Sequence, residues 1–204
     1  FMPDEIPDVD TKIYHLAGLI SGDFSNELIY SLSKRGNKLA LDVQCMLRHA
    51  LPDGTMVFRD WDGKEEYMKY IDFLKTDAAE AEILTGERDR KKAAKILYNH
   101  GAKEIMITHN TEVLIYDGKE TYTCPIRSRN LSGRTGRGDT CFSGYILERL
   151  TRGIPESLLF ATALVSLKME KPGPFKGSRA DVKDYISKFY PDYQFQGRVL
   201  NAKE

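Results

Sequence analysis

The residues best suited to chemistry lie in one glycine-rich stretch, SGRTGRGDTCFSGY, which covers residues 132–145. Gly133 is followed after four residues by Gly138 and then by the hydroxyl of Thr140, which is the glycine spacing of a phosphate-binding loop. Where such a loop carries a lysine to hold phosphate, this chain carries Asp139. A carboxylate would repel a resting phosphate, so its presence here needs a different chemical reason.

Proton transfer supplies that reason. Gly133, Gly136 and Gly138 can adopt the positive φ angles that bring successive backbone N–H groups onto one anion, and the helix expected after them points its positive end at the same spot. Phosphoryl transfer needs such donors for the transferred group and a base for the attacking hydroxyl. We therefore interpret Asp139 as a general base; the alternative is that Asp139 only caps the helix that starts there.

Strand and helix patterns alternate along the rest of the chain and must position this loop. Apolar strands are predicted at residues 12–18, 37–43, 71–77 and 103–109, and a hairpin at residues 112–124 around Asp117-Gly118. Helices are predicted at residues 23–35, 78–85, 88–100, 140–152, 155–170 and 178–189. The first strand, helix and strand predict a parallel pair, and the whole alternation predicts a three-layer α/β/α sandwich with a mainly parallel sheet.

Length and charge restrict the class of protein. The 204 residues, 41% of them hydrophobic and 29% charged, suffice for one sizeable core, and we expect a single α/β domain over residues 1–204. Thirty basic residues balance thirty acidic ones, so no overall field favours nucleic acid or an anionic membrane as a partner. The apolar runs are too short to span a bilayer and the acidic start is unlike a signal peptide, so we expect a cytoplasmic protein.

The cysteines also indicate a cytoplasmic protein. Cys45, Cys124 and Cys141 are odd in number, widely spaced and in apolar surroundings, which predicts reduced thiols in the core rather than a disulfide framework. The sequence contains no CxxC or HExxH pairing, so it gives no indication of a zinc site.

Four segments in order resemble a known family. RTGRGDTCFSGY resembles the signature of the ribokinase-like carbohydrate kinases, the PfkB family. KTDAAEAEILTG, at residues 75–86, is similar to its Asn-x-x-Glu segment, with Asp77 in the asparagine place and Glu80 in the glutamate place. LDVQCMLR, at 41–48, resembles its Asp-x-Gln strand end, and ALVSLKMEKPGP, at 163–174, resembles the helix and glycine turn beside the adenine pocket.

The resemblance implies an ATP-dependent kinase that phosphorylates a hydroxyl of a sugar, cyclitol or nucleoside. Asp139 would be the catalytic base, and the amides of Gly136, Arg137 and Gly138 would form the anion hole. Asp77 and Glu80 would position Mg²⁺, and Asp42 and Gln44 would face the substrate or phosphate. The residues implied to border the nucleotide are Thr108, Thr135, Gly136, Gly138, Ala163 and Gly173.

Each of these roles has a simpler structural alternative. Asp77 and Glu80 lie one turn apart at a helix start, where acids favour the helix dipole, and Asp42 could simply end a strand. Arg137 stands where the family carries alanine, so it either adds a cation near the phosphates or points to solvent. A non-catalytic nucleotide-binding or regulatory module derived from such a kinase is therefore the alternative function.

The resemblance also implies missing parts. The N-terminal strands and the small β lid of the family, which supply most sugar contacts, have no counterpart before Lys12. We therefore expect the reaction type to be better defined than the substrate, although the segment versions are closest to a branch that includes inositol kinases. An exposed sheet edge is also expected, which allows pairing into a homodimer.

Overall fold

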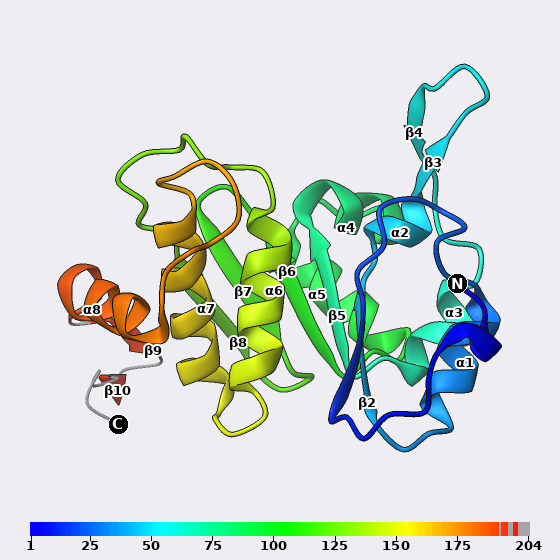
Figure 1. Ribbon diagram of the computed structural model, residues 1–204, viewed down its shortest axis with the longest axis horizontal. Coiled ribbons are helices and arrows are strands. Elements are labelled where there is room, and N and C mark those ends of the chain that lie inside the picture. The colour runs from blue at the N-terminus through cyan, green and yellow to red at the C-terminus, as the bar shows by residue number, and fades with distance from the viewer. Residues whose placement is uncertain (192, 196–197, 200–204) are drawn as a thin grey trace. The chain divides into compact units, whose positions relative to one another are not determined.

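The computed structural model describes residues 1–191, 193–195 and 198–199 (Figure 1). The chain divides into two compact units, of which the first comprises Phe1–Thr108 and Tyr116–Thr121 and the second comprises His109–Ile115 and Tyr122–Glu204. The domain predicted over residues 1–204 also includes residues 192, 196–197 and 200–204, which lie outside the described residues. A single domain over residues 1–204 stays a prediction.

Four parallel strands form the centre of the first unit. Their order is β1 (Ile13–Leu16), β2 (Lys38–Asp42), β5 (Phe73–Asp77) and β6 (Glu104–Thr108), and each neighbouring pair is parallel. β2, β5 and β6 are buried along almost their whole length, as strands covered on both faces must be, which explains their continuous apolar runs. All four predicted strands are confirmed, and their parallel register aligns polar residues at the carboxyl ends.

Helices and short loops complete the first unit. α1 (Asn26–Ser33) connects β1 to β2; Oγ of Ser25 caps its first turn, and its apolar face is buried. A hairpin that the sequence analysis did not predict, β3 (Arg48–Ala50) with β4 (Met56–Phe58), projects from this unit (Figure 1). The other helical segments are η1 (Pro3–Glu5), α2 (Gln44–Leu47), α3 (Lys64–Tyr67), η2 (Met68–Tyr70), α4 (Ala78–Thr85) and α5 (Arg90–Asn99).

The second unit is mainly helical. α6 (Arg137–Glu148) packs closely on α7 (Ile154–Lys168): a Cβ on Gly144 would lie 2.6 Å from Cδ2 of Leu164, so glycine lets the two helices approach. The predicted hairpin is present as the neighbouring strands β7 (Glu112–Tyr116) and β8 (Thr121–Pro125). The remaining elements of this unit are α8 (Arg179–Phe189) and the antiparallel pair β9 (Gln194–Phe195) and β10 (Arg198–Val199).

The core confirms the predicted character of the cysteines. Cys45, Cys124 and Cys141 are free thiols and all are buried, and burial raises the pKa of both Cys45 and Cys124 to about 12. These thiols are therefore packing groups rather than nucleophiles. Over the part of the chain that the structure describes, every helix is too short or too polar to cross a bilayer.

Candidate active site

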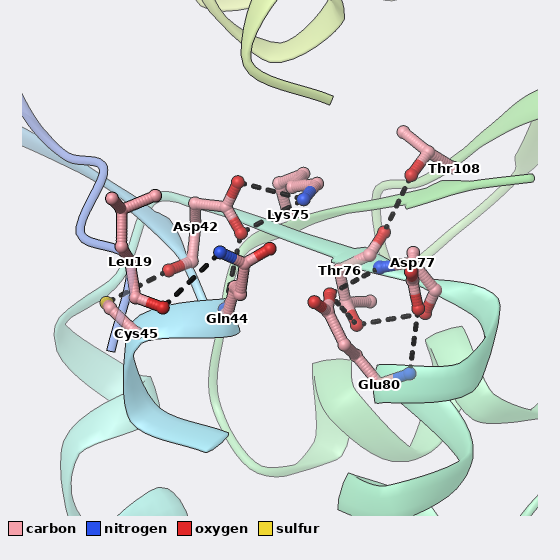
Figure 2. Close-up of polar contacts among 9 residues, drawn as sticks. All are labelled: Leu19, Asp42, Gln44, Cys45, Lys75, Thr76, Asp77, Glu80 and Thr108. Atoms are coloured by element: carbon pink, nitrogen blue, oxygen red, sulfur yellow. Dashed lines mark hydrogen bonds and ion pairs between the residues drawn. The ribbon is translucent and has the colours of Figure 1, made fainter. Parts of the chain in front are cut away.

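The first polar cluster lies at the carboxyl ends of β2 and β5 (Figure 2). Asp42 ends β2 and pairs in register with Lys75 of β5. Nζ of Lys75 donates to both carboxylate oxygens of Asp42, at 3.0 and 2.8 Å, and each side chain is only 6% exposed. Burial opposes the ammonium charge, but the Asp42 carboxylate and other nearby acids outweigh it and raise the pKa of Lys75. The ammonium of Lys75 therefore keeps its charge in a site where a charge without a partner would be costly.

Gln44 lies next to this ion pair at the start of α2. Its backbone N–H donates to Oδ1 of Asp42 at 3.3 Å, and its side-chain amide donates to the carbonyl of Leu19 at 3.4 Å. Contacts from Lys75 and Gln44 together hold the Asp42 carboxylate in one orientation. The structure thus brings together Asp42 and Gln44, the two residues predicted to face the substrate.

Asp77 and Glu80 form a capping box at the start of α4. Oδ1 of Asp77 accepts from the N–H groups of Ala79 and Glu80 at 2.9 and 2.8 Å, and Oε2 of Glu80 accepts from the N–H of Asp77 at 2.8 Å. Glu80 is 4% exposed, and burial raises its pKa to about 7 against the opposing effect of the Lys75 ammonium. The simpler role of these acids, stabilising a helix start, is therefore present in the structure.

That capping role is compatible with magnesium binding. The capping box uses Oδ1 of Asp77 and Oε2 of Glu80, and carboxylate oxygens are the hard ligands that Mg²⁺ prefers. Within the described residues, no group of three or more His, Cys, Asp or Glu side chains could hold a metal ion. Two carboxylates alone would leave most of an octahedral shell to water and to donor phosphates, as is usual for Mg²⁺ in phosphoryl transfer.

The glycine loop of the second unit is fixed through its backbone. The N–H of Gly133 donates to the carbonyl of Met169 at 2.7 Å, and a Cβ on Gly133 would lie 1.9 Å from the carbonyl oxygen of Lys171. Nζ of Lys168, whose residue is 3% exposed, donates to the carbonyl of Gly133 at 2.6 Å and also to that of Thr135. A buried ammonium thus anchors the loop to the end of α7, and only glycine fits at position 133.

α6 begins at Arg137, three residues before the predicted start. Gly136 occupies the N-cap position with φ of +75°, a conformation that favours glycine, and its carbonyl accepts from the N–H and the hydroxyl of Thr140. Glycine has no side chain to cap the first turn, whose N–H groups have no partner within the helix, so these donors suit an anion. The N–H of Arg137 donates to the carbonyl of Arg134 at 3.3 Å, and the anion hole expected at residues 136–138 stays a prediction.

Asp139 lies in this first turn and its side chain is exposed. Oδ2 of Asp139 lies 3.9 Å from the position that a Cβ on Gly136 would take, so the carboxylate stays near the N-cap backbone. The alternative that Asp139 is the N-cap residue is wrong, because Gly136 holds that position. An exposed carboxylate can accept a proton from a hydroxyl, and the role of Asp139 as that base stays a prediction.

Two arginines of the loop meet one asparagine. Nη2 of Arg134 and Nη1 of Arg137 both donate to Oδ1 of Asn110, at 2.9 and 2.5 Å. Asn110 lies in the turn before β7. Arg137 therefore does not simply extend into solvent, which was one of the two alternatives expected for its side chain.

The residues predicted to border the nucleotide lie in different settings. In the first unit, Thr108 ends β6, is buried, and donates from Oγ1 to the carbonyl of Thr76 at 3.4 Å (Figure 2). In the second unit, Thr135 is exposed on the loop and Ala163 is fully buried in α7. Gly173 has φ of +84°, and a Cβ added at this position would have no neighbouring atom within 4 Å.

A cavity of about 460 Å³ lies beside Gly173 in the second unit. Its lining combines three ammonium groups with one carboxylate and apolar surface, and Lys168 connects it to the glycine loop. Such a mixed lining suits a ligand that carries both negative charge and a flat apolar part. The lining includes Lys168, Lys171, Lys176, Asp181, Pro172 and Phe175.

Sequence reasoning missed Lys75, Lys168 and Asn110. Lys75 interrupts the apolar strand IDFLKTD, and Lys168 interrupts the apolar helix segment ALVSLKM. A single lysine within an apolar run signals a buried ammonium that needs a partner, so both could have been selected as candidates. Asn110 had no comparable signal, because its role depends on the position of a distant loop.

Comparison with known proteins places this site in a family. Residues 10–180 match the pfkB family carbohydrate kinases, which is most of the chain. The chain therefore belongs to the pfkB family. Its glycine loop with Asp139 and its Asp77 to Glu80 segment are the positions that the family resemblance had selected.

Individual relatives differ in substrate and donor. The chain is 38% identical over 105 residues to a cytidine kinase from Thermococcus kodakarensis. This match covers 45% of this chain and 37% of that protein. It is also similar to a solved pyrophosphate-dependent kinase in the ribokinase family complexed with a pyrophosphate analog and myo-inositol. The two chains are 35% identical with a TM-score of 0.84, and the match covers 90% of this chain and 66% of that one. An Arabidopsis thaliana ribokinase complexed with ribose and ATP shares 20% identity and a TM-score of 0.65 over 79% of this chain and 51% of that one, which supports the ribokinase-like α/β fold.

Proposed function

We propose that this chain provides the catalytic part of a kinase that transfers the terminal phosphoryl group of a polyphosphate donor to a hydroxyl of a small molecule. The observation that carries the proposal is the exposed Asp139 carboxylate in the first turn of α6, next to a glycine N-cap. The chain spans 37% of the curated cytidine kinase and 66% of the pyrophosphate-dependent structure, so the activity of the whole protein is part of this proposal.

The chemistry assigns one role to each part of the loop. Asp139 accepts the proton of the acceptor hydroxyl as the acceptor oxygen bonds to phosphorus. The amides of Gly136, Arg137 and Gly138 receive the charge on the transferred group, and these donors are already oriented by the Lys168 contacts to the loop carbonyls. Because the loop is fixed before the donor binds, little reorganisation is needed during the reaction.

The proposal gives separate roles to the acids and the amide at the carboxyl ends of β2 and β5. Asp77 and Glu80 would hold Mg²⁺, which neutralises donor phosphates when bound. Asp42 acts as an oriented hydrogen-bond acceptor, together with Gln44, rather than as a base, because both of its oxygens already accept from Lys75. An acceptor molecule with several hydroxyl groups suits this fixed carboxylate. Its hydroxyls donate hydrogen bonds to the Asp42 oxygens, so they are not buried without a partner.

The acceptor is best assigned to the cyclitol class. The structural relative complexed with myo-inositol covers 90% of this chain at 35% identity, whereas the cytidine kinase covers 45% of it. A sugar or a nucleoside is the other class that the family resemblance implies. The acceptor class is therefore decided by turnover of these compounds side by side.

Two donors fit the loop. ATP is the donor implied by the family resemblance, and the cavity beside Gly173 offers a mixed surface suited to a nucleotide. Inorganic pyrophosphate is the second candidate, because a similar structure is pyrophosphate-dependent and because Arg134 and Arg137 place two cations on the loop. Either donor would leave the proposed role of Asp139 unchanged.

The test is a matrix of donors and acceptors. ATP and pyrophosphate are each combined with myo-inositol, ribose and cytidine, and product is followed as the phosphorylated acceptor in the presence of Mg²⁺. We expect turnover of at least one acceptor with one donor. Donor binding without phosphorylation of any acceptor would instead support the non-catalytic nucleotide-binding or regulatory module.

A further inference from the structure

A second cavity, of about 360 Å³, lies in the first unit at the amino ends of three parallel strands. Lys38 begins β2, Asp72 directly precedes β5, and Lys103 directly precedes β6. Asp42 and Asp77 end β2 and β5, so this cavity lies at the opposite edge of the sheet from these two carboxylates. The other lining residues are Ser33, Lys34, Gly36, Asn37, Lys69 and Tyr70.

The lining of this cavity is strongly basic, although the chain as a whole has no net charge. Four lysines line it together with a single acid, Asp72, and Nζ of Lys103 donates to Oδ1 of Asp72 at 2.8 Å. Among the residues that the structure describes, Lys34, Lys38 and Lys69 form no ion pair with an acid. Three ammonium groups around one cavity repel each other, and an anion bound between them relieves that repulsion.

Aromatic rings restrain these three ammonium groups. Each Nζ lies 4.6–5.3 Å from the centroid of a neighbouring ring. The pairs are Lys34 with Tyr30, Lys38 with Phe73 and Lys69 with Tyr70. Two of the rings, Tyr30 and Tyr70, also pack edge to face at a centroid distance of 5.4 Å. A ring face attracts an ammonium group but carries no net negative charge, so the lysines are held in place while their charge is still available to a ligand.

The backbone beneath the lysines is fixed by other contacts. Oδ2 of Asp72 accepts from the N–H of Leu39 at 2.9 Å, and the N–H of Asp72 donates to the carbonyl of Leu39 at 2.8 Å. Nδ2 of Asn37 donates to the carbonyl of Thr11 at 2.5 Å. The one acid of the lining is thus used by the backbone of β2 and by Lys103, which leaves the other three lysines as the groups that can meet a ligand.

We propose that this cavity binds a small molecule that carries two or more phosphate groups. Three ammonium groups match the charge of such a ligand better than that of a single monovalent anion, and lysine binds phosphate as a point charge. The volume of about 360 Å³ is at the lower end of the range for small-molecule sites and has room for more than one phosphate group. Apart from Gly36 and Tyr70, the lining residues are polar or charged, which disfavours an apolar ligand. None of them belongs to the proposed kinase site, so the cavity and the kinase function are tested separately.

The experiment uses calorimetry without Mg²⁺, with tripolyphosphate, orthophosphate and citrate as the probes. K34Q/K38Q/K69Q removes the three ammonium groups but keeps long side chains that can lie over the rings. K34R/K38R/K69R keeps the positive charge, and D72N removes the one acid of the lining. Any binding of tripolyphosphate at the glycine loop would persist in K34Q/K38Q/K69Q, so the difference from the parent measures the cavity alone.

The matched control is K91Q/K92Q/K95Q. It removes three exposed lysines from α5 of the same unit and therefore changes the net charge of the chain by the same amount. Far-ultraviolet circular dichroism establishes that each variant is folded. Melting temperatures with and without tripolyphosphate give a second measurement of binding, because a ligand that binds only the folded chain stabilises it.

The expected result is a loss specific to the cavity lysines. K34Q/K38Q/K69Q should weaken tripolyphosphate binding by about 10–100-fold, since three charged contacts are lost, and should abolish the rise in melting temperature. The triple arginine variant and the control should stay close to the parent. D72N should tighten binding several-fold, because it removes a repelling carboxylate and releases Lys103. Orthophosphate should bind about 10-fold more weakly or worse, and added salt should weaken binding of both phosphates.

Four outcomes would overturn the proposal. The first is a parent chain that binds no tripolyphosphate, and the second is equal affinity in the parent and K34Q/K38Q/K69Q. The third is an equal loss in K91Q/K92Q/K95Q, which would show an effect of net charge rather than a site. The fourth is citrate binding as tight as that of tripolyphosphate, which would exclude recognition of phosphate. If the triple glutamine variant is unfolded, D72N decides, and an affinity equal to or below that of the parent would exclude the site.

Discussion

Replacing Lys75 by methionine should strongly destabilise the first unit. The substitution keeps the length of the side chain but removes the ammonium that donates to both oxygens of Asp42, in a site where both side chains are 6% exposed. Breaking a buried ion pair by removing one partner costs about 3–5 kcal/mol, because the remaining charge has no compensation. At about 2–4 °C per kcal/mol for a chain of this size, the melting temperature should fall by roughly 6–20 °C.

Thermal and urea unfolding, followed by circular dichroism, measure this effect. Lys103→Met is the matched control, because Lys103 pairs with Asp72 at the surface and is 65% exposed, so its loss should cost less than about 1 kcal/mol. The double variant D42N/K75M should recover much of the lost stability, since no uncompensated carboxylate remains. A K75M variant as stable as K103M would refute the argument that this pair is a buried charge pair.

Three further predictions concern the loop, the second unit and the metal. G133A should lose about 1–3 kcal/mol of stability, since its Cβ would meet the Lys171 backbone, whereas G153A meets only the end of the Glu156 side chain and should cost less in the same urea titration. Hydrogen bonding to Arg129 lowers the pKa of Glu170 to about 2 in the folded chain, so the contribution of this carboxylate to stability is present above pH 4.5 and is lost as the pH falls toward 2. The melting temperatures of the parent and E170Q should therefore differ at pH 7 and converge in acid. A difference that stays constant with pH would contradict this prediction. E80Q should raise the Mg²⁺ concentration needed for half-maximal turnover, whereas E82Q, on the exposed face of the same helix, should not; equal Mg²⁺ requirements would exclude Glu80 as a ligand.

Much of the fold was predictable because its local signals agree with its tertiary structure. The buried parallel strands β2, β5 and β6 appear in the sequence as continuous apolar runs, and the Asp117-Gly118 hairpin has a strong turn signal. The β3–β4 hairpin was missed because its strands are short and none of their residues is buried, so they lack a buried alternating pattern. The start of α6 was placed too late because the positive φ of Gly136, which sets that boundary, has no local signal beyond glycine itself.

The candidate site was predictable where function imposes a motif and not where it depends on tertiary contacts. Asp139 was identified from the spacing of the glycines around it, whereas Asp77 and Glu80 were identified from the resemblance of their segment to the family. The partners that orient this chemistry, Lys75 for Asp42 and Lys168 for the loop, are 33 positions or more from the groups they hold. Such partners depend on how strands and helices meet, which a local motif does not encode.

The most direct test of the central claim is the turnover of Asp139→Asn with the best donor and acceptor. Asparagine keeps the size of the side chain but cannot accept the proton, so kcat should fall by about 10²–10⁴-fold. Donor affinity measured by calorimetry should stay close to that of the parent, because a base acts in the transition state. A D139N variant with the turnover of the parent would contradict the account.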